Sequence, residues 1–170
     1  MDWLDFKEFV KDTFKYVVFV VAVIVMAVYV IGLQQIVGDS MNPTFKNNDV
    51  ILIDKLTPSF VELKRGDVIS FYFEESKYLI KRIIGLPGET IEIKDSKIYI
   101  DGKEIKDYVE GVNTSDFNLK EYGYDRIPDD MYFVLGDNRE NSMDSRDYRV
   151  GLVKRENIVG KKLIRLWPLF

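Results

Sequence analysis

Serine chemistry is the first possibility that this sequence raises, because Ser40 lies in a tight turn with the letters VGDSMNPTF. A serine hydroxyl becomes a useful nucleophile only when a nearby base removes its proton. The chain contains no histidine and no cysteine, which excludes an imidazole base, a thiol nucleophile and a zinc site built from these residues. The base would therefore be a lysine, an aspartate, a glutamate or a terminal amine. Glycine, asparagine, aspartate and proline also form ordinary turns, so a purely structural role for Ser40 stays open.

A lysine can act as this base only where its surroundings lower its pKa. An ordinary lysine, with a pKa of about 10.4, is neutral in only about one molecule in two thousand at pH 7. Burial without a compensating carboxylate lowers that pKa by roughly 3 to 5 units. Lys81 fits this requirement best, because it lies in YLIKRIIGLPGE between Leu79–Ile80 and Ile83–Ile84, whereas most other lysines lie in turns or beside charges. The alternative is an edge-strand lysine that points to water.

A polar loop, GDNRENSMDSR, follows the apolar stretch YFVLG and carries a third set of candidate residues. Ser142 offers a hydroxyl that can orient a neutral lysine amine. Asp144 and Arg146 are placed to form an ion pair that holds the loop. Supporting hydrogen bonds and ion pairs of this kind hold a catalytic base in its productive position. A well-capped surface loop has the same composition, so that interpretation stays open as well.

An apolar segment precedes the serine turn and predicts a membrane anchor. The 18 residues from Tyr16 to Leu33 carry no charged or strongly polar side chain. As a helix they cover roughly 27 Å, close to the roughly 30 Å hydrocarbon core of a bilayer. We therefore expect a transmembrane helix over residues 16–35. A cleavable signal peptide is the alternative, but its apolar part is about 7 to 15 residues long and ends at a small-residue site, which Gln-Gln-Ile-Val-Gly does not provide.

The distribution of lysines around this segment predicts its orientation. Lys7, Lys11 and Lys15 precede it, and only Lys46 lies within the next fifteen residues. Positive charge favours the cytoplasmic side. We expect residues 1–15 to be cytoplasmic, the chain to cross the cell membrane once, and residues 36–170 to form an extracytoplasmic domain.

The region after the apolar segment reads as short strands. β-branched and aromatic runs or alternating patterns predict strands at 49–56, 66–73, 77–84, 130–135 and 160–167, and a hairpin with a further tight turn over 90–105. A polar connection spans 107–126, and a short helical turn is expected at 154–157. An all-β domain of antiparallel strands follows from this pattern. The net charge of −4 gives no general attraction to nucleic acid.

With these features together, the chain resembles a bacterial type I signal peptidase, a membrane-anchored serine protease with a Ser-Lys dyad that removes signal peptides from exported preproteins. The resemblance is carried by four blocks in the family's order, SMNPTF, RGDVISF, IKRIIGLPGE and GDNRENSMDSR. It implies a partly open, barrel-like arrangement of antiparallel sheets. It also implies that Ser40 is the nucleophile and Lys81 the general base, with Ser142, Asp144 and Arg146 in support.

The resemblance also bears on the oxyanion hole, the group of donors that stabilises the negative charge of the intermediate. In the family this hole uses the backbone N–H of the nucleophile, here Ser40. Some members add a serine hydroxyl two residues earlier, where this chain has Gly38. The second oxyanion donor is therefore left open by the sequence.

The substrate expected from the resemblance is an extended peptide cut after a small-x-small motif. It would lie as an added strand beside two segments of the chain. The residues implied in its binding are Ile36, Val37, Gly38, Met41, Leu79 and Ile80. Neither a metal nor a cofactor is implied, and the expected partners are preprotein signal peptides and the lipid bilayer, with the enzyme working as a monomer.

Two other functions are compatible with parts of the pattern. A self-cleaving repressor with a similar serine turn would also use a Ser-Lys dyad, but the apolar anchor and the lack of a DNA-binding helical domain argue against it. A membrane-tethered β domain without enzymatic activity would use all four blocks as structural loops. Cleavage of a preprotein separates these functions from a signal peptidase.

Overall fold

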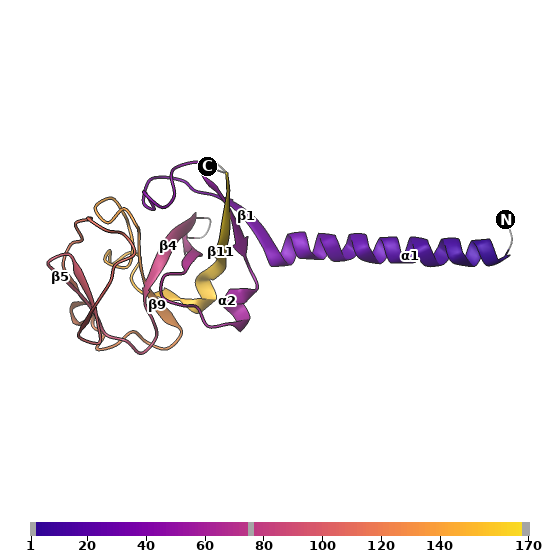
Figure 1. Cartoon of the computed structure of the whole chain (residues 1–170). Helices are drawn as coiled ribbons and strands as arrows, with labels where there is room; N and C mark the ends of the chain where they lie inside the picture. Colours follow the sequence, from indigo (N-terminus) through magenta and orange to yellow (C-terminus); the bar gives the residue numbers. More distant parts are fainter. Residues whose placement is uncertain (1–2, 75–76, 168–170) are drawn as a thin grey trace.

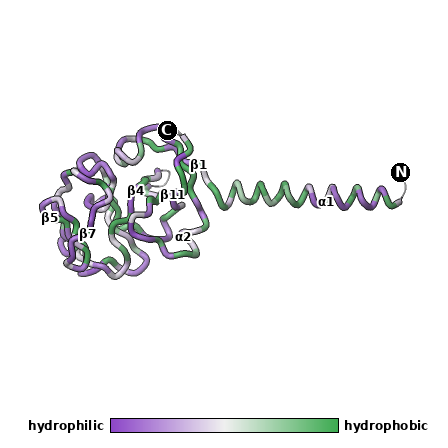
Figure 2. The backbone as a smooth tube through the Cα atoms, viewed as in Figure 1, coloured by the Kyte–Doolittle hydropathy of each residue, from purple (hydrophilic) through white to green (hydrophobic). Residues whose placement is uncertain are grey.

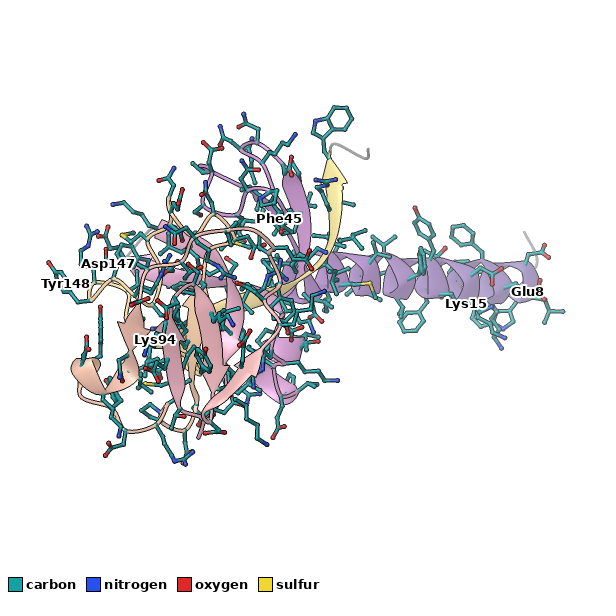
Figure 3. All side chains as sticks on the ribbon, turned by 60° about the vertical axis from the view of Figure 1, so that its left-hand side comes forward. Glu8, Lys15, Phe45, Lys94, Asp147 and Tyr148 are labelled. Carbon is teal, nitrogen blue, oxygen red and sulfur yellow. The ribbon has the colours of Figure 1, made fainter. Side chains whose placement is uncertain are left out.

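One long helix and a β domain make up the protein, whose computed structural model describes residues 3–74 and 77–167. Helix α1 (Trp3–Val25) continues into a π-helical turn, η1 (Met26–Val30), and projects away from the β domain (Figure 1). Figure 3 shows Glu8 and Lys15 on the half of α1 farthest from the β domain, with Asp147 and Tyr148 at the opposite end of the molecule.

The helical segment has the composition of a membrane span. The segment from Trp3 to Val30 is long and apolar enough to cross a bilayer. Its most apolar 18-residue window has a mean hydropathy of 2.3, and none of that window is buried by the other described residues. Figure 2 shows that its polar residues gather toward the N-terminus and that the part nearer the β domain is hydrophobic. A helix that is apolar on all sides and uncovered is typical of a membrane-spanning segment.

The helix ends earlier than the sequence predicts. Residues 31–35, expected to be helical, form strand β1 (Ile31–Gln35), which pairs with β2. Lys55 stabilises this transition: its backbone N–H donates to Val30 O at 2.9 Å and its Nζ to Val28 O at 3.0 Å, which satisfies two carbonyls at the helix end. An apolar run fits a helix or a strand equally well, and pairing with β2 decides in favour of the strand.

Two antiparallel sheets form the β domain, which confirms the predicted fold class. The larger has seven strands in the order β1-β2-β11-β3-β4-β9-β10, and its two edge strands are not paired to each other, so the barrel is open. Its further strands are β2 (Val50–Asp54), β3 (Val68–Glu74), β4 (Lys77–Gly85), β9 (Met131–Leu135), β10 (Val153–Lys154) and β11 (Ile158–Trp167).

The smaller sheet has four strands in the order β7-β6-β5-β8. They are β5 (Ile91–Lys94), β6 (Lys97–Ile100), β7 (Lys103–Ile105) and β8 (Phe117–Asn118). The predicted hairpin is confirmed, because Asp95 and Ser96 have φ values of 51° and 63°, as a two-residue turn between right-twisted strands requires. The tight turn at Asp101–Gly102 is confirmed in the same way, with φ values of 49° and 73°.

The other predicted strands are confirmed to within a few residues at their ends, and the turn at 154–157 is the 3-10 helix η3 (Arg155–Asn157). The sequence patterns missed β1, β8 and β10, together with α2 (Thr57–Phe60) and η2 (Leu119–Tyr122). Each of these elements has only two to five residues. A periodic pattern cannot be recognised over so short a length.

Buried apolar side chains form three clusters, of which one supports the serine turn. Residues of β2, β3 and β4 pack there against side chains from the turn itself. The cluster consists of Ile36, Met41, Phe45, Ile51, Ile53, Val68 and Ile80. The turn is therefore anchored in the core on both sides of Ser40.

Candidate active site

The serine turn is held by backbone hydrogen bonds and by two buried side chains. The N–H of Asn42 donates to Asp39 O at 3.0 Å, and that of Phe45 donates to Met41 O at 2.8 Å. Met41 and Phe45 are 1% and 3% exposed. Ser40 lies between these anchors with its side chain half-buried, so its hydroxyl has a fixed position at the protein surface.

Lys81 lies beside this hydroxyl from the neighbouring strand β4. It pairs with Ile69 of β3 and is 1% exposed. Its Nζ lies 2.7 Å from Ser40 Oγ and donates to Ile80 O at 3.0 Å. The alternative of an edge-strand lysine in water is therefore wrong.

Burial gives Lys81 the pKa of a usable base. Desolvation lowers the pKa of its amine from 10.5 to about 8, against the opposing charges of Asp144 and Asp137, which raise it. A neutral amine has two N–H groups and one lone pair. One N–H is used by Ile80 O, which leaves the lone pair available to accept the proton of Ser40 Oγ.

The loop from Gly136 to Arg146 packs directly on the serine turn. Asn138 donates from its backbone N–H to Ser40 O at 3.0 Å and from Nδ2 to Asp39 O at 3.1 Å. Asp144, which is fully buried, accepts from Gly136 N at 3.0 Å and pairs with Arg146 at 2.8 and 2.9 Å. The predicted ion pair is present, and it fixes the loop that positions the backbone of Ser40.

Ser142 is close to the site but does not bond to the lysine. Its Oγ is buried and has no hydrogen-bond partner within the described residues. It packs against Gly136: a Cβ added to this glycine would lie 2.0 Å from Ser142 Oγ and 2.5 Å from Ser40 O. Only glycine fits at position 136, and Ser142 lies next to the backbone carbonyl of Ser40.

A buried ion pair that the sequence patterns did not reveal connects the four sequence blocks. Arg82 donates from Nε and Nη2 to the two carboxylate oxygens of Asp137 at 2.9 and 2.6 Å. Thr44 donates its hydroxyl to the same carboxylate, and Arg82 Nη1 donates to Gly66 O at 2.9 Å. The sequence gives no local signal for this pair, because Arg82 and Asp137 lie 55 positions apart.

A second missed ion pair ties the polar connection to the same loop. Arg139 is 2% exposed and donates from Nη2 to Asp107 Oδ1 at 2.5 Å and from Nε to Gly136 O at 3.0 Å. Nothing in the sequence pattern distinguishes Asp107 from the other acidic residues of this connection. Its role depends on how the two sheets are arranged.

A cleft of about 260 Å³ runs from the serine and lysine toward β1. Its walls are the chain that leaves β1 and the first half of β4. The lining residues are Gln34, Gln35, Ile36, Val37, Ser40, Met41, Tyr78, Leu79, Ile80 and Lys81. Every residue predicted to bind substrate lines it except Gly38, while Gln34, Gln35 and Tyr78 were not predicted.

Both walls of the cleft present unpaired backbone. Strand β9 pairs with β4 only from Arg82 onward, so the edge of residues 77–81 that faces away from β3 has no strand partner among the described residues. On the opposite wall, Val37 is 86% exposed, and its N–H and C=O have no partner within the described chain. An extended peptide can add to such edges.

The backbone around Ser40 provides one available donor for an oxyanion. No group within residues 3–74 and 77–167 accepts a hydrogen bond from the Ser40 N–H. The N–H of Gly38 is already used, because it donates to Asn47 Oδ1 at 2.9 Å. For metal binding, no cluster of three histidine, cysteine, aspartate or glutamate residues with suitable geometry is found in the part of the chain that the structure describes.

Known proteins with similar sequences and structures define the class. A family model described as "Signal peptidase, peptidase S26" matches residues 7–167. Signal peptidase I P of Bacillus subtilis subsp. natto is 40% identical over 139 residues, which is 78% of this chain and 75% of the relative. Signal peptidase I of Bacillus caldolyticus is 37% identical over 161 residues, or 87% of each chain.

A crystal structure of a signal peptidase I from Enterococcus faecalis V583 is similar to this chain, with a TM-score of 0.53 and 36% identity. The match covers 61% of this chain and 97% of that chain. These likenesses first define the protein as a serine peptidase. The chain belongs to the signal peptidase family, peptidase S26. Membership supports signal-peptide cleavage, and it excludes a β domain without enzymatic activity.

Proposed function

We propose that this chain is a membrane-anchored endopeptidase that cleaves signal peptides with Ser40 as nucleophile and Lys81 as general base. The observation that carries the proposal is the distance of 2.7 Å between Ser40 Oγ and Lys81 Nζ, at a lysine that is 1% exposed. No other base is needed to activate the hydroxyl. Family membership supplies the reaction class, and this geometry supports the assignment of the two residues.

Catalysis proceeds in two steps. Ser40 Oγ attacks the scissile carbonyl while its proton moves to Lys81 Nζ, and the developing negative charge is stabilised by the Ser40 N–H. Lys81 then protonates the leaving amine, and the amide bond breaks to leave an acyl ester on Ser40. Water attacks this ester with Lys81 again as the base, which releases the signal peptide and restores the hydroxyl.

Supporting residues hold these groups in position. Asp144 and Arg146 fix the loop of residues 136–146, which carries Asn138 to the carbonyl of Ser40. Ser142 packs beside the same carbonyl. Its hydroxyl has no hydrogen-bond partner among the described residues and is available to the Lys81 amine when the amine moves between its two proton transfers. Positioning of this kind supplies much of the barrier reduction in enzymes.

The cleft determines which peptide is cut. A substrate strand lies between residues 36–38 and the free edge of β4, with its backbone paired to both. Ile36, Met41, Leu79 and Ile80 limit the space for side chains to a cleft of about 260 Å³. Small residues at the position before the cut and two positions earlier are the ones that fit.

Anchoring by α1 brings this cleft to the bilayer. We place residues 1–15 in the cytoplasm and the β domain outside, with the domain beginning at Ile31 where β1 starts. The cut then falls just past the apolar segment of a signal peptide held in the same bilayer.

Cleavage of a preprotein tests this function. We expect purified enzyme in vesicles to cut a preprotein once, after a small-x-small motif. We expect it not to cut a control substrate that consists of the mature domain without the signal peptide. Replacing the small residue before the cut with phenylalanine is expected to reduce cleavage roughly 10- to 100-fold, because forcing a larger side chain into a packed cleft costs about 1–3 kcal/mol. Cleavage of the mature domain, or of the phenylalanine substrate at the original rate, would contradict the proposal.

The pH dependence follows from the pKa of Lys81. Only neutral Lys81 accepts the proton, so kcat/KM for a peptide substrate is expected to rise about tenfold per pH unit below pH 8 and to level off above it. Measurement of kcat/KM from pH 6 to pH 10 checks this. A rate that stays constant between pH 6 and pH 9 would exclude an amine with this pKa as the base.

A further inference from the structure

A groove of about 1120 Å³ lies where the helix meets the β domain. It is open, and its walls come from the end of α1, from η1, β1 and β2, and from Tyr72 of β3 and Tyr78 of β4. Most of the lining is apolar and includes Val23, Met26, Ala27, Leu52, Tyr72 and Tyr78. We call it the junction groove.

The junction groove is continuous with the active-site cleft. Gln34, Gln35 and Tyr78 line both. Tyr78 packs against Tyr72 with the rings tilted by 38°, their centroids 4.7 Å apart and their hydroxyl oxygens 3.3 Å apart, and each residue is nearly half exposed. A peptide that leaves the cleft toward the helix therefore passes this tyrosine pair and enters the groove.

We infer that the junction groove binds the apolar segment of the signal peptide that precedes the cleavage site, an inference that rests on the proposed function. The apolar segment lies in the bilayer, as α1 does, so the N-terminal side of the substrate points toward α1. Gln34 lies four residues before Gly38, about 13 Å along an extended chain. The substrate thus reaches the groove about four or five residues before the cut, where its apolar segment begins.

The chemistry of the groove changes along this path as the substrate does. At the cleft end, glutamine side chains and tyrosine hydroxyls can form hydrogen bonds with a polar peptide segment at the membrane–water interface. Farther on, Met26 and Val28 present apolar side chains that are 55% and 52% exposed. Apolar side chains of a second segment can pack on this surface in place of lipid.

The shape of the groove is fixed rather than adaptable. Lys55 bonds to Val28 O and Val30 O, which sets the angle at which η1 leaves the sheet. Gly32 allows this close approach, because a Cβ there would lie 2.7 Å from the Lys55 Cε. The ammonium of Lys55 is thereby turned to the helix end, where it complements the dipole.

Disulfide trapping tests the inference, since the chain has no cysteine of its own. In a Ser40→Ala background, Met26→Cys places a thiol in the groove, and Ile24→Cys is the control, because both side chains are 55% exposed but Ile24 does not line the groove. The probe is a preprotein in vesicles with one cysteine in its apolar segment. We expect at least about fivefold more cross-linking to Met26→Cys, since a disulfide needs Cα atoms within about 7 Å. Equal cross-linking at both positions would mean that lipid fills the groove, and would overturn the inference.

A substitution that fills the junction groove tests the inference independently, through the kinetics of the active enzyme. Ala27→Trp occupies the groove, whereas Ile24→Trp adds the same ring outside its lining. We expect Ala27→Trp to raise KM for the full preprotein about tenfold with kcat unchanged, and to leave cleavage of a short peptide without the apolar segment at the wild-type rate. Wild-type KM for the preprotein in Ala27→Trp would contradict the inference. If wild type cuts neither substrate, it is the proposed function that fails.

Discussion

A Lys81→Met variant is expected to lose about 10³-fold in kcat/KM while becoming more resistant to unfolding. Methionine keeps the length and much of the volume of the side chain but cannot accept a proton, and a positioned general base contributes between about 10² and 10⁴ in rate. The loss should appear in kcat, because the side chain is buried behind Ser40 and adds little to the substrate-binding surface. Activity within tenfold of wild type would mean that the base is another group.

The stability of this variant follows from the pKa of Lys81. Its folded value of about 8 is below the ordinary 10.5, so the charged amine is disfavoured in the fold by up to about 3 kcal/mol below pH 8. This penalty disappears as pH rises from 8 to 10.5, because the unfolded chain then binds more protons than the folded one. We expect Lys81→Met to raise the free energy of unfolding at pH 7 by about 1–3 kcal/mol, measured by urea titration. A variant less stable than wild type at pH 7 would contradict the desolvation argument.

An Asp137→Ala variant is expected to lose about 3–5 kcal/mol of stability. Asp137 is fully buried and accepts both arms of the Arg82 guanidinium, which is itself largely buried. Removal of the carboxylate leaves that charge without its partner in a desolvated site, which is the costly way to break an ion pair. It also releases Thr44 of the serine turn, so cleavage is expected to fall with stability.

Asp147→Ala is the matched control for this change. Its partner Arg149 is 57% exposed, and the pair lies at the molecular surface, where salt bridges contribute less than about 1 kcal/mol. Urea unfolding of the two variants in parallel separates a buried ion pair from a general effect of losing an aspartate. Equal losses in the two variants would contradict the assigned role of Asp137.

The sequence predicts most of the sheet but not the way in which its loops meet. Alternating patterns and two-residue turns such as Asp95–Ser96 are local, so the strands and the hairpin are found without the structure. The apolar pairs Leu79–Ile80 and Ile83–Ile84 make Lys81 the best candidate for a buried lysine, but its position beside Ser40 depends on how the serine turn packs against β4. Strand β1 could not be predicted from local sequence, because it is the pairing with β2 that makes the end of an apolar run a strand instead of a helix.

The contacts that could not be predicted from the sequence are those between residues far apart along the chain. The ion pair of Arg82 with Asp137 joins residues that are 55 positions apart, and it depends on the pairing of β4 with β9. The bond between Arg139 and Asp107 depends on how the smaller sheet packs against the loop. The junction groove depends on the angle between α1 and β2, which Lys55 sets. None of these relations produces a period or a spacing in the sequence.

The most direct test of the account is whether residue 40 attacks the substrate, and the absence of cysteine makes that test specific. In a Ser40→Cys variant the only thiol of the chain replaces the hydroxyl. The measurement is cleavage of a preprotein, with the new N-terminus determined, by wild type, Ser40→Ala and Ser40→Cys before and after alkylation. The account predicts that Ser40→Ala does not cleave, that alkylation removes whatever cleavage Ser40→Cys retains, and that it leaves wild type unchanged. Cleavage at the same bond by Ser40→Ala or by alkylated Ser40→Cys at the wild-type rate would contradict it.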